Sequence, residues 1–183
     1  LVVPCYNELE YIQPTISILS RLLNVTKYSY EIILFDDGSV DGSKEIGMEI
    51  ASRDEKIRFE AHDRNYGRGK TIADGIRLAR ARIVGYVDID LEIPAVFMLP
   101  AILAVENGAD IAVASRLALL DSRQLSAYER LRNVPYRLLR RTMTIVYCQV
   151  LKYVLGVHIY PEAGLKFYNK ERILPLLDQV EDE

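Results

Sequence analysis

Short apolar runs alternate with segments of helical periodicity along most of this chain. Runs that predict strands cover residues 1–5, 30–35, 57–61, 83–87, 111–114 and 164–168. Helices are predicted after Glu8, from 41 to about 53, after a glycine loop at 65–70, from 94 to about 107, over 140–157 and over 171–177. This order predicts an α/β fold with a Rossmann-like, mostly parallel sheet and helices on both faces.

Polar and acidic residues follow three of the predicted strands. Tyr6 to Glu8 follow the first strand, Asp36 and Asp37 the second, and Asp88 and Asp90 the fourth. Functional residues of open parallel sheets lie beyond the carboxyl ends of the strands. We therefore expect these clusters to meet at one edge of the sheet.

The acids after the fourth strand suggest a metal site. Asp88, Asp90 and Glu92 stand at alternate positions, and in an extended chain alternate side chains point the same way. Three carboxylates on one face repel each other unless a cation lies among them, and hard oxygen ligands suit Mg²⁺ or Mn²⁺. A solvated acidic turn explains an isolated Asp-x-Asp equally well, but the other strand-end clusters favour the metal.

Length and composition narrow the possibilities further. At 183 residues the chain fits one domain, and a net charge of −3 predicts no general affinity for nucleic acid. Cys5 and Cys148 are far apart, which indicates reduced thiols. No stretch of 18 apolar residues is present, and the chain opens inside a strand, so we expect a domain excised from a longer protein.

The second half of the sequence contains a basic segment. Seven arginines stand against two acids between Arg116 and Arg141. The predicted helix over 140–157 has a wide apolar face that either packs on the sheet or lies along a membrane surface. His62 and His158 have no evident partner and are interpreted as structural or surface residues.

Four motifs, in their order and spacing, resemble those of glycosyltransferase family 2, especially the dolichyl-phosphate mannose and glucose synthases and their bacterial polyprenyl-phosphate relatives. The motifs occupy residues 3–8, 36–43, 65–70 and 88–94. The resemblance implies a single GT-A type domain, with a nucleotide-sugar-binding half at about 1–94 and an acceptor-binding half at about 95–183.

The resemblance also implies roles for individual residues. It assigns the nucleotide sugar to Pro4, Tyr6, Glu8, Asp36, Asp37, Lys70 and Asp88, and the divalent ion to Asp88, Asp90 and Glu92. It assigns the acceptor phosphate to Arg116, Arg140 and Thr144, and catalysis to Asp90, Arg116 and Arg140. The sequence departs from the family at Tyr160, where relatives commonly have an aspartate, and Glu162 is a possible replacement.

The implied reaction is inverting transfer of a hexose from UDP-glucose or GDP-mannose to a polyprenyl (dolichyl) phosphate at the cytoplasmic face of a membrane. A phosphate acceptor is already ionised and needs no strong general base. Two alternatives stay open. One is transfer to a sugar hydroxyl, which demands a base such as Glu162. The other is a non-catalytic nucleotide-sugar-binding domain, against which Asp88 and Asp90 speak.

Overall fold

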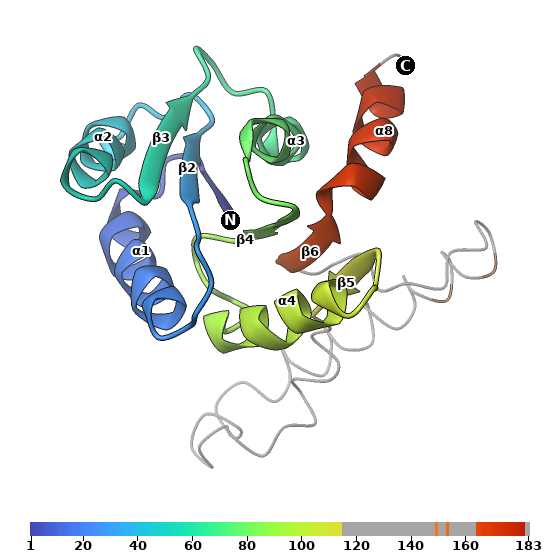
Figure 1. The fold of residues 1–183 in the computed structure, drawn as a ribbon. Coiled ribbons are helices and arrows are strands. Elements are labelled where there is room, and N and C mark those ends of the chain that lie inside the picture. Colours follow the sequence, from blue (N-terminus) through green and yellow to red (C-terminus); the bar gives the residue numbers. More distant parts are fainter. Residues whose placement is uncertain (115–148, 150–152, 154–163, 182–183) are drawn as a thin grey trace. The chain divides into compact units, whose positions relative to one another are not determined.

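A single six-stranded sheet forms the centre of the described part of the chain (Figure 1). The computed structural model describes residues 1–114, 149, 153 and 164–181. The strands lie in the order β3-β2-β1-β4-β6-β5. Their bounds are Val2–Cys5 for β1, Ile32–Asp36 for β2, Ile57–Ala61 for β3, Ile83–Val87 for β4, Ile111–Val113 for β5 and Leu165–Asn169 for β6.

Strand direction divides the sheet into two parts. Strands β1 to β4 are mutually parallel, whereas β6 runs antiparallel to both of its neighbours, β4 and β5. The six predicted strands are confirmed to within about two residues, and the mostly parallel α/β class is confirmed with them. The single reversed strand places the end of the described chain beside β4.

Helices cover both faces of this sheet, as predicted. Their bounds are Leu9–Asn24 for α1, Ser43–Arg53 for α2, Arg68–Leu78 for α3, Met98–Glu106 for α4 and Lys170–Glu181 for α8, with a 3-10 turn, η1, at Ala95–Phe97. Helices α1, α2 and α4 lie on one side, and α3 and α8 on the other (Figure 1). Helix α8 continues beyond its predicted end at Leu177.

Two helical glycines bring the helices close to the sheet. A Cβ at Gly75 of α3 would lie 2.5 Å from Cγ1 of Val2, and one at Gly47 of α2 would lie 2.5 Å from two ring carbons of Phe59. Between α3, α8 and the sheet lies an apolar core cluster that contains Val2, Ile33, Phe35, Ile76, Ala79, Val84 and Tyr86. This packing fixes the start of α3, and with it the loop before it, against the ends of β1 and β2.

The chain divides into two compact units. One contains residues 1–114 and 164–183 and holds the sheet, and the other contains residues 115–163. Of the predicted helix over 140–157, only Gln149 and Tyr153 are described; both are helical and exposed. None of the described helices combines the length and the apolar content needed to cross a bilayer.

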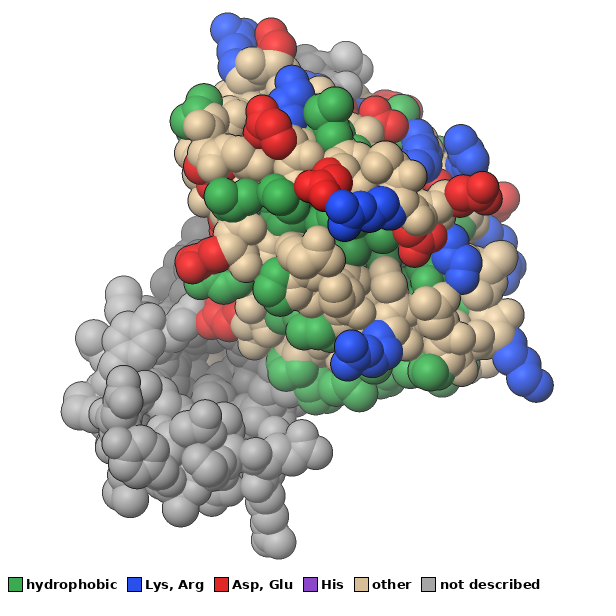
Figure 2. All heavy atoms as spheres, turned by 90° about the vertical axis from the view of Figure 1, so that its left-hand side faces the viewer, with side chains coloured by type: hydrophobic (Ala, Val, Ile, Leu, Met, Phe, Trp, Pro, Cys, Tyr) green, Lys and Arg blue, Asp and Glu red, His purple; other side chains and the backbone are tan. Residues whose placement is uncertain are grey.

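The surface formed by the left-hand side of Figure 1 carries charges of both signs. Figure 2 shows lysine and arginine side chains interspersed with aspartate and glutamate over the described part of this face. A surface of mixed sign does not provide the continuous positive stripe that a nucleic-acid backbone requires. This face therefore agrees with the inference drawn from the net charge.

Candidate active site at the carboxyl edge of the sheet

A cavity of about 480 Å³ opens where the strand order reverses. From β1 the chain proceeds outward to β2 and β3, then returns to place β4 on the opposite side of β1. Such switch points leave a crevice beyond the carboxyl ends of the strands. The cavity is lined by Pro4, Cys5, Tyr6, Glu8, Asp37, Asn65, Gly67, Arg68, Thr71, Asp88, Ile89 and Asp90. Three predicted strand-end clusters thus meet in one place.

Hydrogen bonds between loops position the first cluster. The amide of Asn7, a residue with φ of 54°, donates to Ser39 Oγ at 2.8 Å, and the amide of Val40 donates to Asn7 Oδ1 at 2.9 Å. The amide of Glu8 donates to Ser43 Oγ at 3.2 Å. These bonds tie the loop after β1 to the loop after β2, so Tyr6 and Glu8 are held at the cavity wall.

The cavity carries excess negative charge. Burial, followed by the carboxylates of Asp90 and Asp88, raises the pKa of Glu8 to about 7, and Arg68 opposes this only in part. An acid with a raised pKa reports charges that are not neutralised by neighbours. A cation entering the cavity would relieve this repulsion.

The two acids after β2 have different surroundings. Asp36 is fully buried, and its Oδ2 accepts hydrogen bonds from the amides of Gly38 and Ser39 at 3.2 and 2.9 Å. Asp36 therefore stabilises its own turn and does not line the cavity. Asp37 does line the cavity and accepts from the amides of Tyr66 and Gly67 at 3.0 and 2.8 Å. It fixes the loop that leads into α3.

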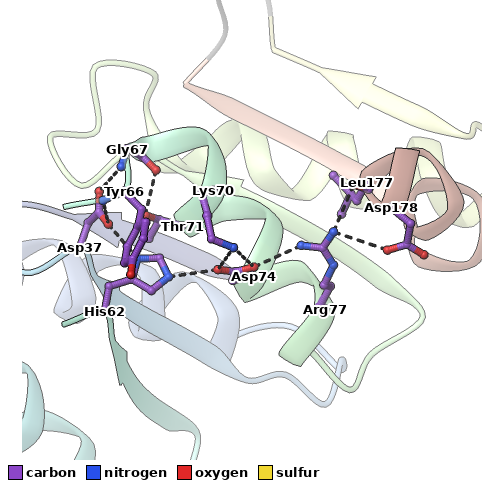
Figure 3. A network of polar contacts seen from close by, with 10 residues as sticks. All are labelled: Asp37, His62, Tyr66, Gly67, Lys70, Thr71, Asp74, Arg77, Leu177 and Asp178. Carbon is purple, nitrogen blue, oxygen red and sulfur yellow. Dashed lines mark hydrogen bonds and ion pairs between the residues drawn. The ribbon is translucent and has the colours of Figure 1, made fainter. Parts of the chain in front are cut away.

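His62 links this carboxylate to a larger polar network (Figure 3). Its Nδ1 lies 2.7 Å from Asp37 Oδ1, and its Nε2 lies 3.0 Å from Asp74 Oδ2. Asp74 also pairs with Lys70 and Arg77, each at 3.1 Å. Burial raises the pKa of Asp37, but the bonds from His62 and the loop amides outweigh burial and leave it below the usual value.

The structure gives each of the two predicted residues in this network a definite place. Lys70 lies along α3 toward Asp74 and is not among the residues that line the cavity (Figure 3). His62 is structural, as interpreted from the sequence, although its two carboxylate partners were not foreseen. His158, Arg116, Arg140, Thr144, Tyr160 and Glu162 lie outside the described residues, and the predictions for them stay predictions.

The acids after β4 lie in a turn and not in an extended strand. Strand β4 ends at Val87, the amide of Leu91 donates to the carbonyl of Asp88 at 3.1 Å, and Leu91 has a φ of 49°. The argument from alternate positions of an extended chain was therefore wrong. Asp88 and Asp90 both line the cavity, whereas Glu92 does not. In the described part of the chain, no three acidic, histidine or cysteine side chains converge closely enough to hold a metal ion by themselves.

Two carboxylates still fit a divalent ion of a particular kind. Mg²⁺ is usually held by one or two carboxylates together with waters and substrate phosphates, and seldom by a complete cage of protein ligands. Asp88 and Asp90 supply two hard oxygen donors on one cavity wall. A Cβ at Gly164 would lie 2.9 Å from Cγ of Asp88, so only glycine leaves room for this carboxylate.

Arg68 is the cavity residue that the sequence analysis missed. Its guanidinium lies 2.5 Å from Asp88 Oδ1 and 5.5 Å from the centre of the Tyr86 ring. The signal was present, because Arg68 belongs to the glycine loop of the third motif and occupies the first position of α3. Attention to Lys70, two residues later, concealed it.

An open α/β sheet with an acidic cavity at its switch point, arranged as in GT-A proteins, defines the class as a glycosyltransferase. The description "Glycosyl transferase family 2" matches residues 1–160, and the chain belongs to that family. The fold of the chain is similar to that of glucosyl-3-phosphoglycerate synthase from Mycobacterium tuberculosis in complex with Mn²⁺, UDP-glucose and phosphoglyceric acid. The TM-score is 0.60 at 20% identity, over 93% of this chain and 55% of that one. It is also similar to a Pyrobaculum calidifontis mannosyltransferase in complex with GDP-Man and Mn²⁺, with a TM-score of 0.59 at 15% identity over 96% and 45% of the two chains.

Sequence relatives carry names that include lipid phosphates. The undecaprenyl-phosphate 4-deoxy-4-formamido-L-arabinose transferase of Yersinia enterocolitica is 29% identical over 97% of this chain and 54% of its own length. The dolichol-phosphate mannosyltransferase of Pyrococcus furiosus is 29% identical over 63% of this chain and 32% of its own length. Glycosyltransferase AglD of Haloferax volcanii is 28% identical over 100% of this chain and 28% of its own length. The chain thus spans between about a quarter and about half of these relatives.

Proposed function

We propose that this glycosyltransferase transfers a hexose, with inversion, from UDP-glucose or GDP-mannose to a polyprenyl phosphate such as dolichyl phosphate, with Mg²⁺ or Mn²⁺. The observation that carries the proposal is the cavity in which Asp88, Asp90 and Arg68 face one another at the switch point. The names of the relatives support the acceptor class. The proposed location is the cytoplasmic face of a membrane, with peripheral association or an anchor elsewhere in the protein.

Each part of the cavity has a task in this proposal. Tyr6 and Pro4 border the space for the nucleoside, and Asp37 holds the loop that closes over it. Asp88 and Asp90 would hold the divalent ion, which supplies Lewis-acid assistance to the departing nucleoside diphosphate. Arg116, Arg140 and Thr144 stay predicted ligands of the acceptor phosphate. Their planar guanidinium groups match phosphate oxygens in shape and charge.

The reaction tests the proposal directly. The protein is incubated with Mn²⁺, labelled UDP-glucose or GDP-mannose, and dolichyl or undecaprenyl phosphate, and labelled lipid is extracted into organic solvent. We expect label in the lipid fraction with one donor, and a loss of about 100-fold in Asp90→Asn. Absence of labelled lipid with both donors and both acceptors, while a known synthase succeeds alongside, would refute the acceptor class. Label appearing only on a sugar hydroxyl would replace it with the alternative.

A further inference from the structure

The charges of the cavity leave a specific problem for an anionic ligand. Among the described residues that line it are four carboxylates, Glu8, Asp37, Asp88 and Asp90, and one guanidinium, Arg68. The diphosphate of a nucleotide sugar is itself negatively charged, so it meets repulsion unless cations stand close to it. Arg68 is therefore the described cavity residue that is suited to attract the diphosphate.

In the structure this guanidinium already has a partner. It pairs with Asp88 at 2.5 Å, and Asp88 is one of the two carboxylates suited to a divalent ion. The pair is easily broken, because the Arg68 side chain is 54% exposed and that of Asp88 is 20% exposed. Ion pairs that reach solvent contribute little stability, so an exchange of partners has a small free-energy cost.

Lys70 illustrates the contrast on the same helix. Its ammonium pairs with Asp74 at 3.1 Å, and Asp74 is also held by His62 and Arg77 (Figure 3). The network has its own balance of charge and lies beside the cavity, not in its wall. Of these two cations of α3, only Arg68 contacts a carboxylate of the cavity.

From this geometry we infer that Arg68 exchanges partners during donor binding. In the free protein its guanidinium neutralises Asp88; when Asp88 turns to the divalent ion, the guanidinium turns to the diphosphate of the donor. The inference rests on the proposed function, and it specifies how the site is regulated: Arg68 competes with the ion for Asp88. It follows that ion and nucleotide bind cooperatively, since each favours the arrangement that the other requires.

Binding measurements separate this exchange from a simple contact. Mn²⁺ affinity is measured by the electron paramagnetic resonance signal of free Mn²⁺, with and without UDP or GDP, and nucleotide affinity by calorimetry. In Arg68→Met we expect Mn²⁺ alone to bind more tightly by about fivefold, because Asp88 is released. We expect UDP or GDP with Mn²⁺ to bind about tenfold more weakly, because the charge-assisted bonds are lost. The cooperativity between Mn²⁺ and nucleotide should fall accordingly.

Two further variants complete the design. Lys70→Met removes the same charge from the same helix without touching the cavity, so it should shift neither affinity by more than about twofold. Arg68→Lys keeps the charge and should recover part of the nucleotide affinity. The inference is overturned if Arg68→Met binds Mn²⁺ as weakly as the unmodified protein does, or if Lys70→Met reproduces both changes. Failure of the unmodified protein to bind either nucleotide would instead refute the proposed function, and the inference with it.

Discussion

Substitution of Gly164 tests whether the position of Asp88 controls donor binding. In Gly164→Ala the new Cβ would lie 2.9 Å from Asp88 Cγ and still closer to Oδ2. The two backbones cannot separate freely, because the amide of Asp88 donates to the carbonyl of Gly164 at 2.8 Å. The carboxylate must therefore rotate away from its present place, which also breaks its pairing with Arg68.

The expected effect has two measurable parts. Overpacking of this kind destabilises a protein by about 1–3 kcal/mol, which urea denaturation measures. Displacement of a metal-binding carboxylate lowers metal affinity by about 10- to 100-fold, which we expect to appear as an equal loss in Mn²⁺-dependent nucleotide binding by calorimetry.

Two other glycines serve as matched controls. Gly69→Ala meets no atom within 4 Å and should retain full binding. Gly47→Ala meets the Phe59 ring at 2.5 Å, far from the cavity, and should lose about 1–3 kcal/mol of stability with no loss of binding. Normal nucleotide binding by Gly164→Ala, or an equal loss in Gly47→Ala, would refute the reasoning.

Three further outcomes follow from the same structure. Asp37→Asn should lower the free energy of unfolding by about 2 kcal/mol at pH 7, because buried amides lose a charged acceptor. The pKa of Asp37 is depressed in the fold, so this stability is present above the usual value of 3.8 and is lost as pH falls. Urea unfolding at pH 7 and pH 3 should show the difference shrinking, and an equal difference at both would contradict it. His62→Phe should cost about 2 kcal/mol by the same measurement, since two carboxylates lose their shared partner, and unchanged stability would argue against the bridge. Removal of divalent ions with EDTA should abolish nucleotide binding, and Mn²⁺ should restore it; binding that persists in EDTA would exclude a metal-dependent site.

Hydrophobic runs predicted the strands because burial on both faces leaves a continuous apolar signal. The runs Ile32–Asp36 and Ile83–Val87 are mostly buried in the structure, as their composition indicates. The direction of a strand leaves no such signal. Strand β6 has the same kind of composition as its parallel neighbours, yet it enters the sheet reversed, between β4 and β5. Its place depends on the path of the chain between 114 and 164, which local pattern does not encode.

The metal-site prediction failed in its geometry for a related reason. Alternation of Asp88, Asp90 and Glu92 implies a common direction only while the backbone stays extended. The turn closed by the Leu91 amide reorients the chain after Asp88, and Glu92 leaves the cavity. Asp88 and Asp90 remain cavity residues because each follows the end of β4 closely. Residue type was informative here, whereas strand periodicity, applied past the end of the strand, was misleading.

Helical periodicity, applied to α3, separates Arg68 from Lys70 in a way that motif matching does not. Positions three and four residues apart share a helix face. Arg68 and Thr71 are three apart, and both line the cavity. Lys70 is four residues from Asp74, and Asp74 is three from Arg77, so these charges satisfy one another on a different face. A cation with an acid one turn away on its own helix is already engaged; Arg68 has Ile72 at that position, so its charge turns to Asp88 across the cavity. The assignment of the diphosphate to Arg68 thus rests on a relation that the sequence contains, once the start of the helix is known.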